Sequence, residues 1–428
     1  MTSPTIFISA GEASGEHYGA LLIDALKVRL TAAGKTGRFF GMGGERMVEA
    51  GLERMVRSED MAVMGITEVL LHLPRIYREF RKLKQSIRER RPDVAVLIDF
   101  PDIHFKLAEE LHRLGVPVIF FVSPQLWAWK KKRIKLVQKY VSRMLVIFPF
   151  EEAFYREQGV KAEFVGHPLT ELPLPEISRE AFAAANGLEA SDTWIGLLPG
   201  SRPKEIRDNL PEMLRSARDL AGNKPADGCD YAFLVPLAPT LNAAQRDEVR
   251  RLVEVQVPGL DVRLVEDARA ALFHARGSVV ASGTATVEAA LIGNPFVVVY
   301  RVSPVTYAIA KRVVKVPHVA MANLIADKRV VPELIQSDFT ATNIVHQLGR
   351  LLPDGAPRES MMKELKAIRG LLNARPAGPD LASGGAIDRV AAATVDQLGF
   401  QTGVQPGVRA DEQPGTASPT PTKETVHL

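Results

Sequence analysis

The segment Ser278-Val-Val-Ala-Ser-Gly-Thr-Ala-Thr-Val-Glu-Ala-Ala-Leu-Ile-Gly-Asn-Pro295 has the pattern of a strand, a glycine turn and a short helix, and a second apolar strand, 296–300, follows it directly. Such alternation is typical of an α/β protein with a parallel sheet. Gly283 lets backbone approach a ligand closely, and Thr284 is a good N-cap. A helix that begins at a strand's carboxyl end directs free N–H groups outward, which favours an anion such as phosphate. The segment therefore predicts a ligand site.

Glu288 is the acidic residue of this predicted helix, near the end of its first turn. Its carboxylate can accept hydrogen bonds from two neighbouring hydroxyls, as a ribose presents them. An acidic side chain near a helix start also complements the helix dipole. The segment alone leaves both interpretations open.

The composition excludes several classes of protein. The chain has 428 residues, of which 46% are hydrophobic and 24% charged, as expected for a globular protein of two or three domains. Its single cysteine, Cys229, excludes an internal disulfide and suits a reducing compartment. A net charge of +4 does not point to nucleic acid as a partner. No segment has the length of apolar sequence that spans a bilayer, so we expect a cytoplasmic protein.

The first strand candidate, 5–9, leads into a loop in which Gly11, Gly15 and Gly19 are spaced four apart. This spacing differs from the tighter glycine pattern of dinucleotide sites, so an NAD site is rejected. Either a substrate approaches the backbone here, or the small residues form the face where a helix packs on the sheet. Ser14 is the expected cap of the following helix.

The apolar run 93–98 predicts a buried parallel strand, and Asp99 and Asp102 follow it. Acidic residues at the carboxyl end of such a strand lie where α/β proteins hold ligands. Asp99 is the better candidate for a general base, whereas Asp102 follows a proline and can equally cap the next helix. A structural aspartate that fixes a turn is the alternative for Asp99.

Two segments combine basic with apolar or aromatic residues. Residues 69–91 predict an amphipathic helix, kinked or restarted at Pro74, with a strongly basic face. Trp127 and Trp129 precede the basic cluster 130–135. Both segments fit contact with an anionic membrane surface. A helix packed on the sheet and tryptophans buried in the core are the alternatives.

A second alternating series begins after the proline-rich stretch 172–176. In it, Arg202 follows the strand and glycine loop of 193–201, where an arginine can contact a pyrophosphate through two hydrogen bonds or can simply be solvated. Residues 331–336 are expected to begin a helix, and helices are expected to continue to about 398. From 402 onward the composition predicts a disordered tail.

Several motifs taken together resemble the lipid-A-disaccharide synthase family over residues 5–395. They are Gly11-Glu-Ala-Ser-Gly15, Met61-Ala-Val-Met-Gly65, Ile98-Asp-Phe-Pro-Asp102, Val122-Ser-Pro-Gln-Leu-Trp-Ala-Trp129, Gly166-His167, Leu198-Pro-Gly-Ser-Arg202, Ser282-Gly-Thr-Ala and Asn323-Leu324. The resemblance implies an α/β fold of the GT-B type, with two Rossmann-like domains whose parallel sheets face a cleft. It implies that the first domain holds the acceptor and the second the sugar nucleotide.

The implied reaction joins UDP-2,3-diacylglucosamine to 2,3-diacylglucosamine 1-phosphate (lipid X) with inversion, which releases UDP and forms a β(1→6) disaccharide. Asp99 matches the family's proposed base. The implied donor contacts are Arg202, Ser201, Gly283, Thr284, Glu288, Asn323 and Gln336, and the implied acceptor contacts are Glu12, Ser14, Gly15, Met64 and Trp127. No metal ion and no cofactor are expected. Glu16 is a departure, because many relatives have aspartate there.

The resemblance also predicts an organisation of the chain and its partners. We expect an acceptor and membrane-facing domain over 1–170, a UDP-sugar domain over 171–345, C-terminal helices over 346–400 that pack back or exchange in a homodimer, and a tail over 401–428. Because both substrates are amphiphiles, peripheral association with the cytoplasmic surface of the inner membrane is expected. A UDP-N-acetylglucosamine 2-epimerase and a non-catalytic sugar-nucleotide or lipid-binding protein are the competing interpretations.

Overall fold

The computed structural model describes residues 3–61, 66–128, 133–222, 230–303, 307, 316–373 and 384–399. Met64, Trp129, Cys229 and the tail 401–428, which the sequence singled out, lie outside these residues. Within the described part of the chain, no helix is both long and apolar enough to cross a membrane.

Seven parallel strands form the first sheet, in the order β3-β2-β1-β4-β5-β6-β7. The strands are β1 (Thr5–Ala10), β2 (Arg38–Gly43), β3 (Leu52–Arg57), β4 (Val94–Ile98), β5 (Val118–Phe121), β6 (Arg143–Val146) and β7 (Ala162–Phe164). The accompanying helices are α1 (Ala13–Ala32), α2 (Glu45–Glu49), η1 (Ser58–Asp60), α3 (Ile66–Arg90), α4 (Pro101–Arg113), α5 (Ile134–Tyr140) and α6 (Pro149–Glu157).

Six parallel strands form the second sheet, in the order β10-β9-β8-β11-β12-β13. The strands are β8 (Thr193–Leu198), β9 (Tyr231–Pro236), β10 (Val262–Val265), β11 (Gly277–Ala281), β12 (Phe296–Tyr300) and β13 (Glu333–Ile335). The helices are α7 (Arg179–Asn186), α8 (Pro203–Ala221), α9 (Ala243–Gln256), α10 (Ala268–His274), α11 (Thr284–Ile292), α13 (Met321–Ala326), η4 (Gln336–Asp338), α14 (Ala341–Leu351) and α15 (Ala356–Leu372).

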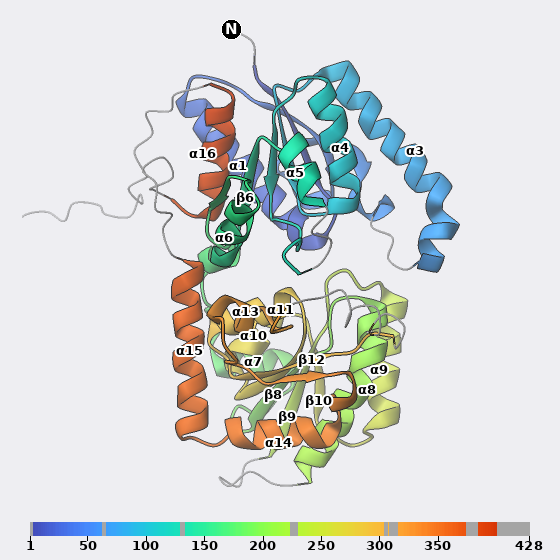
Figure 1. Ribbon diagram of the computed structural model, residues 1–428. Helices are drawn as coiled ribbons and strands as arrows, with labels where there is room; N and C mark the ends of the chain where they lie inside the picture. The colour runs from blue at the N-terminus through green and yellow to red at the C-terminus, as the bar shows by residue number, and fades with distance from the viewer. Residues whose placement is uncertain are drawn as a thin grey trace, which may run out of the picture.

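Two segments pass between the sheets. The first leaves β7 through η3 (Pro168–Glu171), and the second leaves α15 for α16 (Ala386–Gln397), which packs beside α1 of the first sheet (Figure 1). The segments are hydrogen-bonded to each other, because His167 N donates to Leu372 O at 3.1 Å and Arg389 Nη1 donates to Val165 O at 2.8 Å. The two parallel-sheet domains confirm the predicted fold class.

One local prediction was wrong. Residues 331–336 were expected to begin a helix, but they form β13, which pairs with β12 in the register Val299↔Leu334, followed by η4. An apolar run of this length fits a buried strand as well as a helix turn, and the free edge of β12 decides between them. Pro74 was expected to kink or restart the helical region, and α3 runs through it as one helix, so the helix does not restart there. Leu83 and Ile87 of α3 are buried in the core of the first domain.

Candidate active site

The strand order reverses once in each sheet, between β1 and β4 in the first and between β8 and β11 in the second. In open parallel sheets, ligands bind beyond the carboxyl ends of the strands at such a reversal. Glu12 follows β1, Asp99 follows β4, Arg202 follows β8 and Gly283 follows β11. The residues predicted from the sequence therefore flank both reversals.

The backbone at Asp99 is held in an uncommon conformation. Asp99 and Phe100 both have a φ of 51°, in the left-handed region that non-glycine residues seldom adopt. Three contacts stabilise this turn: Asp99 N donates to Phe121 O at 2.9 Å, His104 Nδ1 lies 2.5 Å from Asp99 O, and the Phe100 ring lies over Gly11. A Cβ at Gly11 would be 2.3 Å from that ring, so only glycine fits there.

His104 connects this turn to the centre of the sheet. Because Asp99 O can only accept, His104 Nδ1 must carry the proton, and Nε2 then accepts from the Ser9 hydroxyl at 2.8 Å. The imidazole is fully buried, and this burial lowers the pKa of His104 to about 4. His104 is therefore a neutral bridge between β1 and the Asp99 turn. Sequence reasoning missed it, although a histidine within an apolar helix start was the available signal.

The Asp99 carboxyl has a strongly perturbed acidity. Burial raises the pKa of Asp99 from 3.8 to about 7, and the negative charge of Glu12 adds to this effect. A hydrogen bond from the Phe100 backbone and the positive charge of Arg202 act in the opposite direction. A carboxyl with a pKa near neutral pH is suited to accept a proton as a general base.

Arg202 connects the two domains. Its Nη2 lies 3.4 Å from Glu12 Oε2 of the first domain, and its Nη1 lies 3.0 Å from Glu205 Oε1 in the first turn of α8. The side chain is 46% exposed, so it can exchange these carboxylates for another anion. Ser201 belongs to the same loop, where its backbone N–H donates to Glu205 Oε2 at 3.1 Å.

Around α11, the cap differs from the prediction and Glu288 lies deeper in the helix. Gly283, with a φ of 152°, is the N-cap, whereas Thr284 is the first helical residue and its side chain is exposed. Glu288 is the fifth helical residue, beyond the first turn, and its Oε1 lies 3.5 Å from Arg269 Nη1. Burial raises the pKa of Glu288, and the charge of Arg269 opposes this. A role of Glu288 as a first-turn dipole partner is therefore excluded.

Tyr18 is influenced by carboxylates of both domains. This buried residue of α1 has its pKa raised first by burial and then by the charges of Glu288 and Asp99. Both acidic groups are therefore within electrostatic range of one phenol, although they follow strands of different sheets. The structure thus brings the donor and base candidates to one place.

The Asn323 side chain does not face an open site. It is fully buried and uses all of its hydrogen-bonding groups: Nδ2 donates to Val331 O and Glu333 Oε1, and Oδ1 accepts from the backbone of Val330 and Val331, at 2.7–2.9 Å. Asn323 therefore organises the loop before β13. Gln336 also has a left-handed backbone, and its Nε2 donates to Val302 O at 3.2 Å.

The predicted acceptor residues lie in two places. Glu12, Ser14 and Gly15 are at the start of α1, where Ser14 is a helical residue and Glu12, not Ser14, occupies the N-cap position. Trp127 lies apart from them: its Nε1 donates to Glu151 Oε1 at 3.2 Å, and its ring packs against the core of the second domain.

Glu16 and Glu151 have structural partners that the sequence did not reveal. The Glu16 carboxylate accepts a hydrogen bond from Arg46 N at 3.0 Å. Burial raises the pKa of Glu151 to about 8. No group of acidic, histidine or cysteine side chains arranged to hold a metal ion is found in the described ranges.

Comparisons with known proteins agree with this geometry. The family model for lipid-A-disaccharide synthetase matches residues 6–376. The lipid-A-disaccharide synthase of Acidobacterium capsulatum is 61% identical over 383 residues, which are 87% of this chain and 92% of that protein.

Solved structures share the fold at low identity. A glycotransferase of kitacinnamycin has a TM-score of 0.61 at 16% identity, over 93% of this chain and 100% of the other. A UDP-N-acetylglucosamine 2-epimerase has a TM-score of 0.57 at 11% identity, over 95% and 100%. These likenesses support the fold alone, whereas the sequence matches extend over most of the chain. The chain belongs to the lipid-A-disaccharide synthetase family.

Proposed function

We propose that the protein is an inverting glycosyltransferase that transfers 2,3-diacylglucosamine from UDP to the 6-hydroxyl of 2,3-diacylglucosamine 1-phosphate. The products are the β(1→6) disaccharide 1-phosphate and UDP. The observation that carries the proposal is the placement of Asp99, with its pKa near 7, within the charge range of Glu12 and Arg202 at the meeting point of the two sheets. Membership of the family supports the two substrate classes, a sugar nucleotide and a lipid acceptor.

Asp99 acts as the general base in this mechanism. The acceptor oxygen forms a bond to the anomeric carbon, its proton passes to the Asp99 carboxylate, and the bond from the anomeric carbon to the diphosphate oxygen breaks. A single base on the face opposite the leaving group is sufficient for inversion. The His104 bridge and the Phe100 packing support this role, because they fix the carboxylate before the substrates bind.

Arg202 and the start of α11 receive the leaving group. The arginine exchanges its 3.4 Å contact with Glu12 for the diphosphate, and the backbone N–H groups at Gly283 and Thr284 face the same anion. This arrangement neutralises the charge of UDP without a metal ion. Glu288, one turn further along α11, accepts hydrogen bonds from the ribose hydroxyls. Asn323 and Gln336 shape the donor site through the loops that they hold.

We also propose peripheral association with the cytoplasmic surface of the inner membrane through α3. Several cations of this helix are already paired within the protein, since Lys84 and Arg88 both contact Glu110 at 2.6 Å. Other cations of the helix, such as Arg81, are exposed and are the proposed contacts with anionic lipid. Binding to anionic liposomes that does not weaken at high salt would contradict this electrostatic attachment.

A homodimer built through α15 and α16 is a further part of the proposal. The helix α15 packs on α11 of the second domain and α16 packs on α1 of the first, so α16 is the element that two copies would exchange. Light scattering coupled to size-exclusion chromatography tests this, and a monomeric mass at all concentrations refutes it.

The decisive test of function is a two-substrate assay followed by thin-layer chromatography. Donor and lipid X together should yield a disaccharide product, and a protein that only binds these ligands would yield none. Incubation with UDP-N-acetylglucosamine alone separates the epimerase, because only an epimerase would change that compound.

A further inference from the structure

Arg269 occupies a position between the donor site and the connection that joins the two sheets. It is the second residue of α10, and its Nη1 lies 3.5 Å from Glu288 Oε1. Its Nη2 donates to the backbone oxygen of Pro173 at 2.9 Å. One guanidinium thus contacts both a residue of the proposed ribose site and the chain that leaves the first domain.

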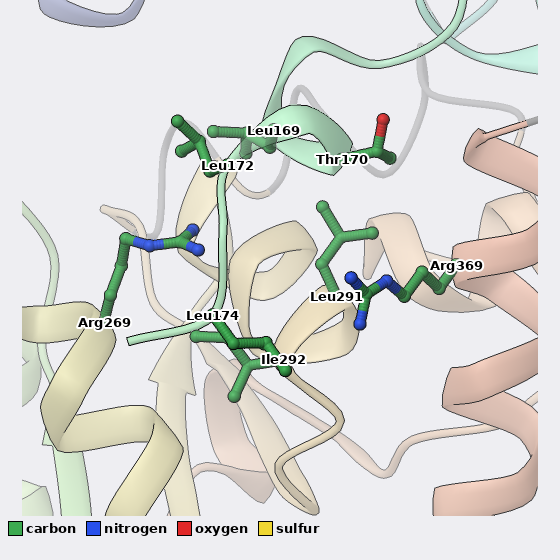
Figure 2. Close-up of a pocket in the computed structure, with 8 residues that line it drawn as sticks. All are labelled: Leu169, Thr170, Leu172, Leu174, Arg269, Leu291, Ile292 and Arg369. Carbon is green, nitrogen blue, oxygen red and sulfur yellow. The ribbon is translucent and has the colours of Figure 1, made fainter. Parts of the chain in front are cut away.

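The surroundings of Arg269 hold it in place. Asp267 Oδ1 accepts from the backbone of Arg269 and Ala270, at 2.9 Å each, and this cap fixes the start of α10. The side chain lines a small cavity of about 10 Å³ together with Leu169, Leu172, Leu174, Leu291, Ile292 and others (Figure 2). Such a volume accommodates roughly one water molecule and no substrate. The cavity walls therefore serve to orient the guanidinium.

The contact with Glu288 is long for an ion pair. Charge-assisted N–H···O bonds are about 2.7–2.9 Å long, and the 3.5 Å separation leaves Arg269 Nη1 buried and without a hydrogen-bond partner among the described residues. Removing the counter-ion of a partly buried charge is costly, so Arg269 and Glu288 constrain each other. Arg269 also opposes the effects of burial and of Asp267, both of which raise the pKa of Glu288. The positive charge of Arg269 thus favours the ionised carboxylate, which can accept hydrogen bonds from two hydroxyls.

The connection packs on the helix that carries Glu288. Leu169 of η3 belongs to the same core cluster as Leu291 of α11, and Leu172 and Ile292 pack against that cluster. The helix α15 also packs on α11, and it ends at Leu372, whose oxygen accepts from His167 N. η3 of the first connection and α15 therefore both pack on α11.

We propose that Arg269 is a positioning residue that orients Glu288 for the donor's ribose and couples donor binding to the interdomain connection at Pro173. This inference rests on the proposed function of Glu288. Arg269 itself touches no reacting atom.

The first test compares the binding of UDP and 2′-deoxy-UDP by calorimetry. In the unaltered protein, loss of the hydroxyl that Glu288 accepts should weaken binding about ten- to a hundredfold, as for a hydrogen bond to a charged group. The quantity compared is the ratio of the dissociation constant of 2′-deoxy-UDP to that of UDP. Arg269→Gln and Glu288→Gln should both reduce this ratio to near one, and combining them should reduce it no further. Arg269→Lys, which keeps the charge, should retain part of the ratio. Arg369→Gln is the matched control, since Arg369 lines the same cavity from α15, and it should retain all of it.

The second test follows amide hydrogen exchange of residues 169–178 at saturating UDP. UDP should slow exchange there in the unaltered protein and in Arg369→Gln, but not in Arg269→Gln, although exchange in α11 should still slow in all three. Thermal unfolding reports whether each variant is folded. The KM for the lipid acceptor should be the same in Arg269→Gln as in the unaltered protein.

Two results would overturn the inference in distinguishable ways. If Glu288→Gln lowers the UDP to 2′-deoxy-UDP ratio and Arg269→Gln does not, Arg269 has no positioning role and the proposed function of Glu288 stands. If Glu288→Gln itself leaves the ratio unchanged, the ribose assignment fails and the inference about Arg269 fails with it.

Discussion

Substitution of Asp99 by asparagine should strongly reduce turnover and at the same time stabilise the protein. Its pKa of about 7, against an ordinary value of 3.8, means that the folded protein favours the protonated form. Ionisation of this carboxyl therefore costs stability, and the cost grows as pH rises from about 4 to about 7. At 1.36 kcal/mol per pH unit the full difference is about 4 kcal/mol. Because Asp99 is partly exposed and solvent screens its charge, we expect a gain of about 1–3 kcal/mol in Asp99→Asn above pH 7.

The assay combines thermal unfolding with single-turnover kinetics. A gain of this size should raise the melting temperature of a unit of 150–250 residues by about 2–10 °C at pH 8, and the gain should vanish near pH 4. Loss of the base should lower kcat by about 10²- to 10⁴-fold. Asp102→Asn is the control, because its carboxyl is 67% exposed and pairs with Arg133, so stability should change by less than about 0.5 kcal/mol.

Two outcomes would refute the reasoning. A melting temperature of Asp99→Asn that falls at pH 8, or a stability difference that does not depend on pH, would show that the fold does not raise the pKa of Asp99. Full turnover in Asp99→Asn would show that another group is the base.

Four further predictions concern the same site. The value of kcat/KM should rise with pH through about 7 and be about fivefold lower at pH 6 than at pH 7, since Asp99 must be ionised. Glu12→Gln removes a negative charge that raises the pKa of Asp99, so it should move the midpoint of this pH profile to lower pH. An unchanged midpoint would contradict the charge coupling between Glu12 and Asp99. Gly11→Ala should lower the free energy of unfolding in urea by about 1–3 kcal/mol and reduce kcat, because the new Cβ would lie 2.3 Å from the Phe100 ring. His104→Ala should reduce kcat but not the donor KM, since it removes the bridge to the Asp99 carbonyl; a change confined to KM would argue against a positioning role. Chelation by EDTA should leave the rate unchanged, because an arginine and helix N–H groups carry the charge of the leaving group, and a loss restored by Mg²⁺ would overturn this.

Sequence reasoning predicted the fold, and placed the candidate site residues at strand ends, for a local reason. Apolar runs ending in glycine, serine or acidic residues specify strands followed by helix starts. Each such pattern is recognised from residues that are adjacent in the sequence. Asp99, Arg202 and Gly283 were found in this way, and each follows a strand beside a reversal of strand order. The wrong helix at 331–336 had the same origin, because a short apolar run does not identify its own partner.

The roles of individual side chains depended on contacts that the sequence does not display. Asn323 resembled a donor ligand, yet its amide is saturated by the loop that precedes β13. Trp127 resembled an acceptor contact, and the structure shows its ring packed against the core of the second domain and its nitrogen donating to Glu151. His104 carried no motif, because its importance comes from the carbonyl and the hydroxyl that its two nitrogens reach.

The sequence by itself determined the alternating α/β architecture, the family and the turns from which the candidate residues project. Only the tertiary structure decided that the pairing of β1 with β4 places Glu12 beside Asp99, that Arg202 of the second domain reaches both, and that Arg269 joins Glu288 to the interdomain connection. The physical reason is that periodicity and turn chemistry act between neighbours in the chain, whereas pKa values and ion pairs depend on groups that come together only when distant strands pair and the two domains meet.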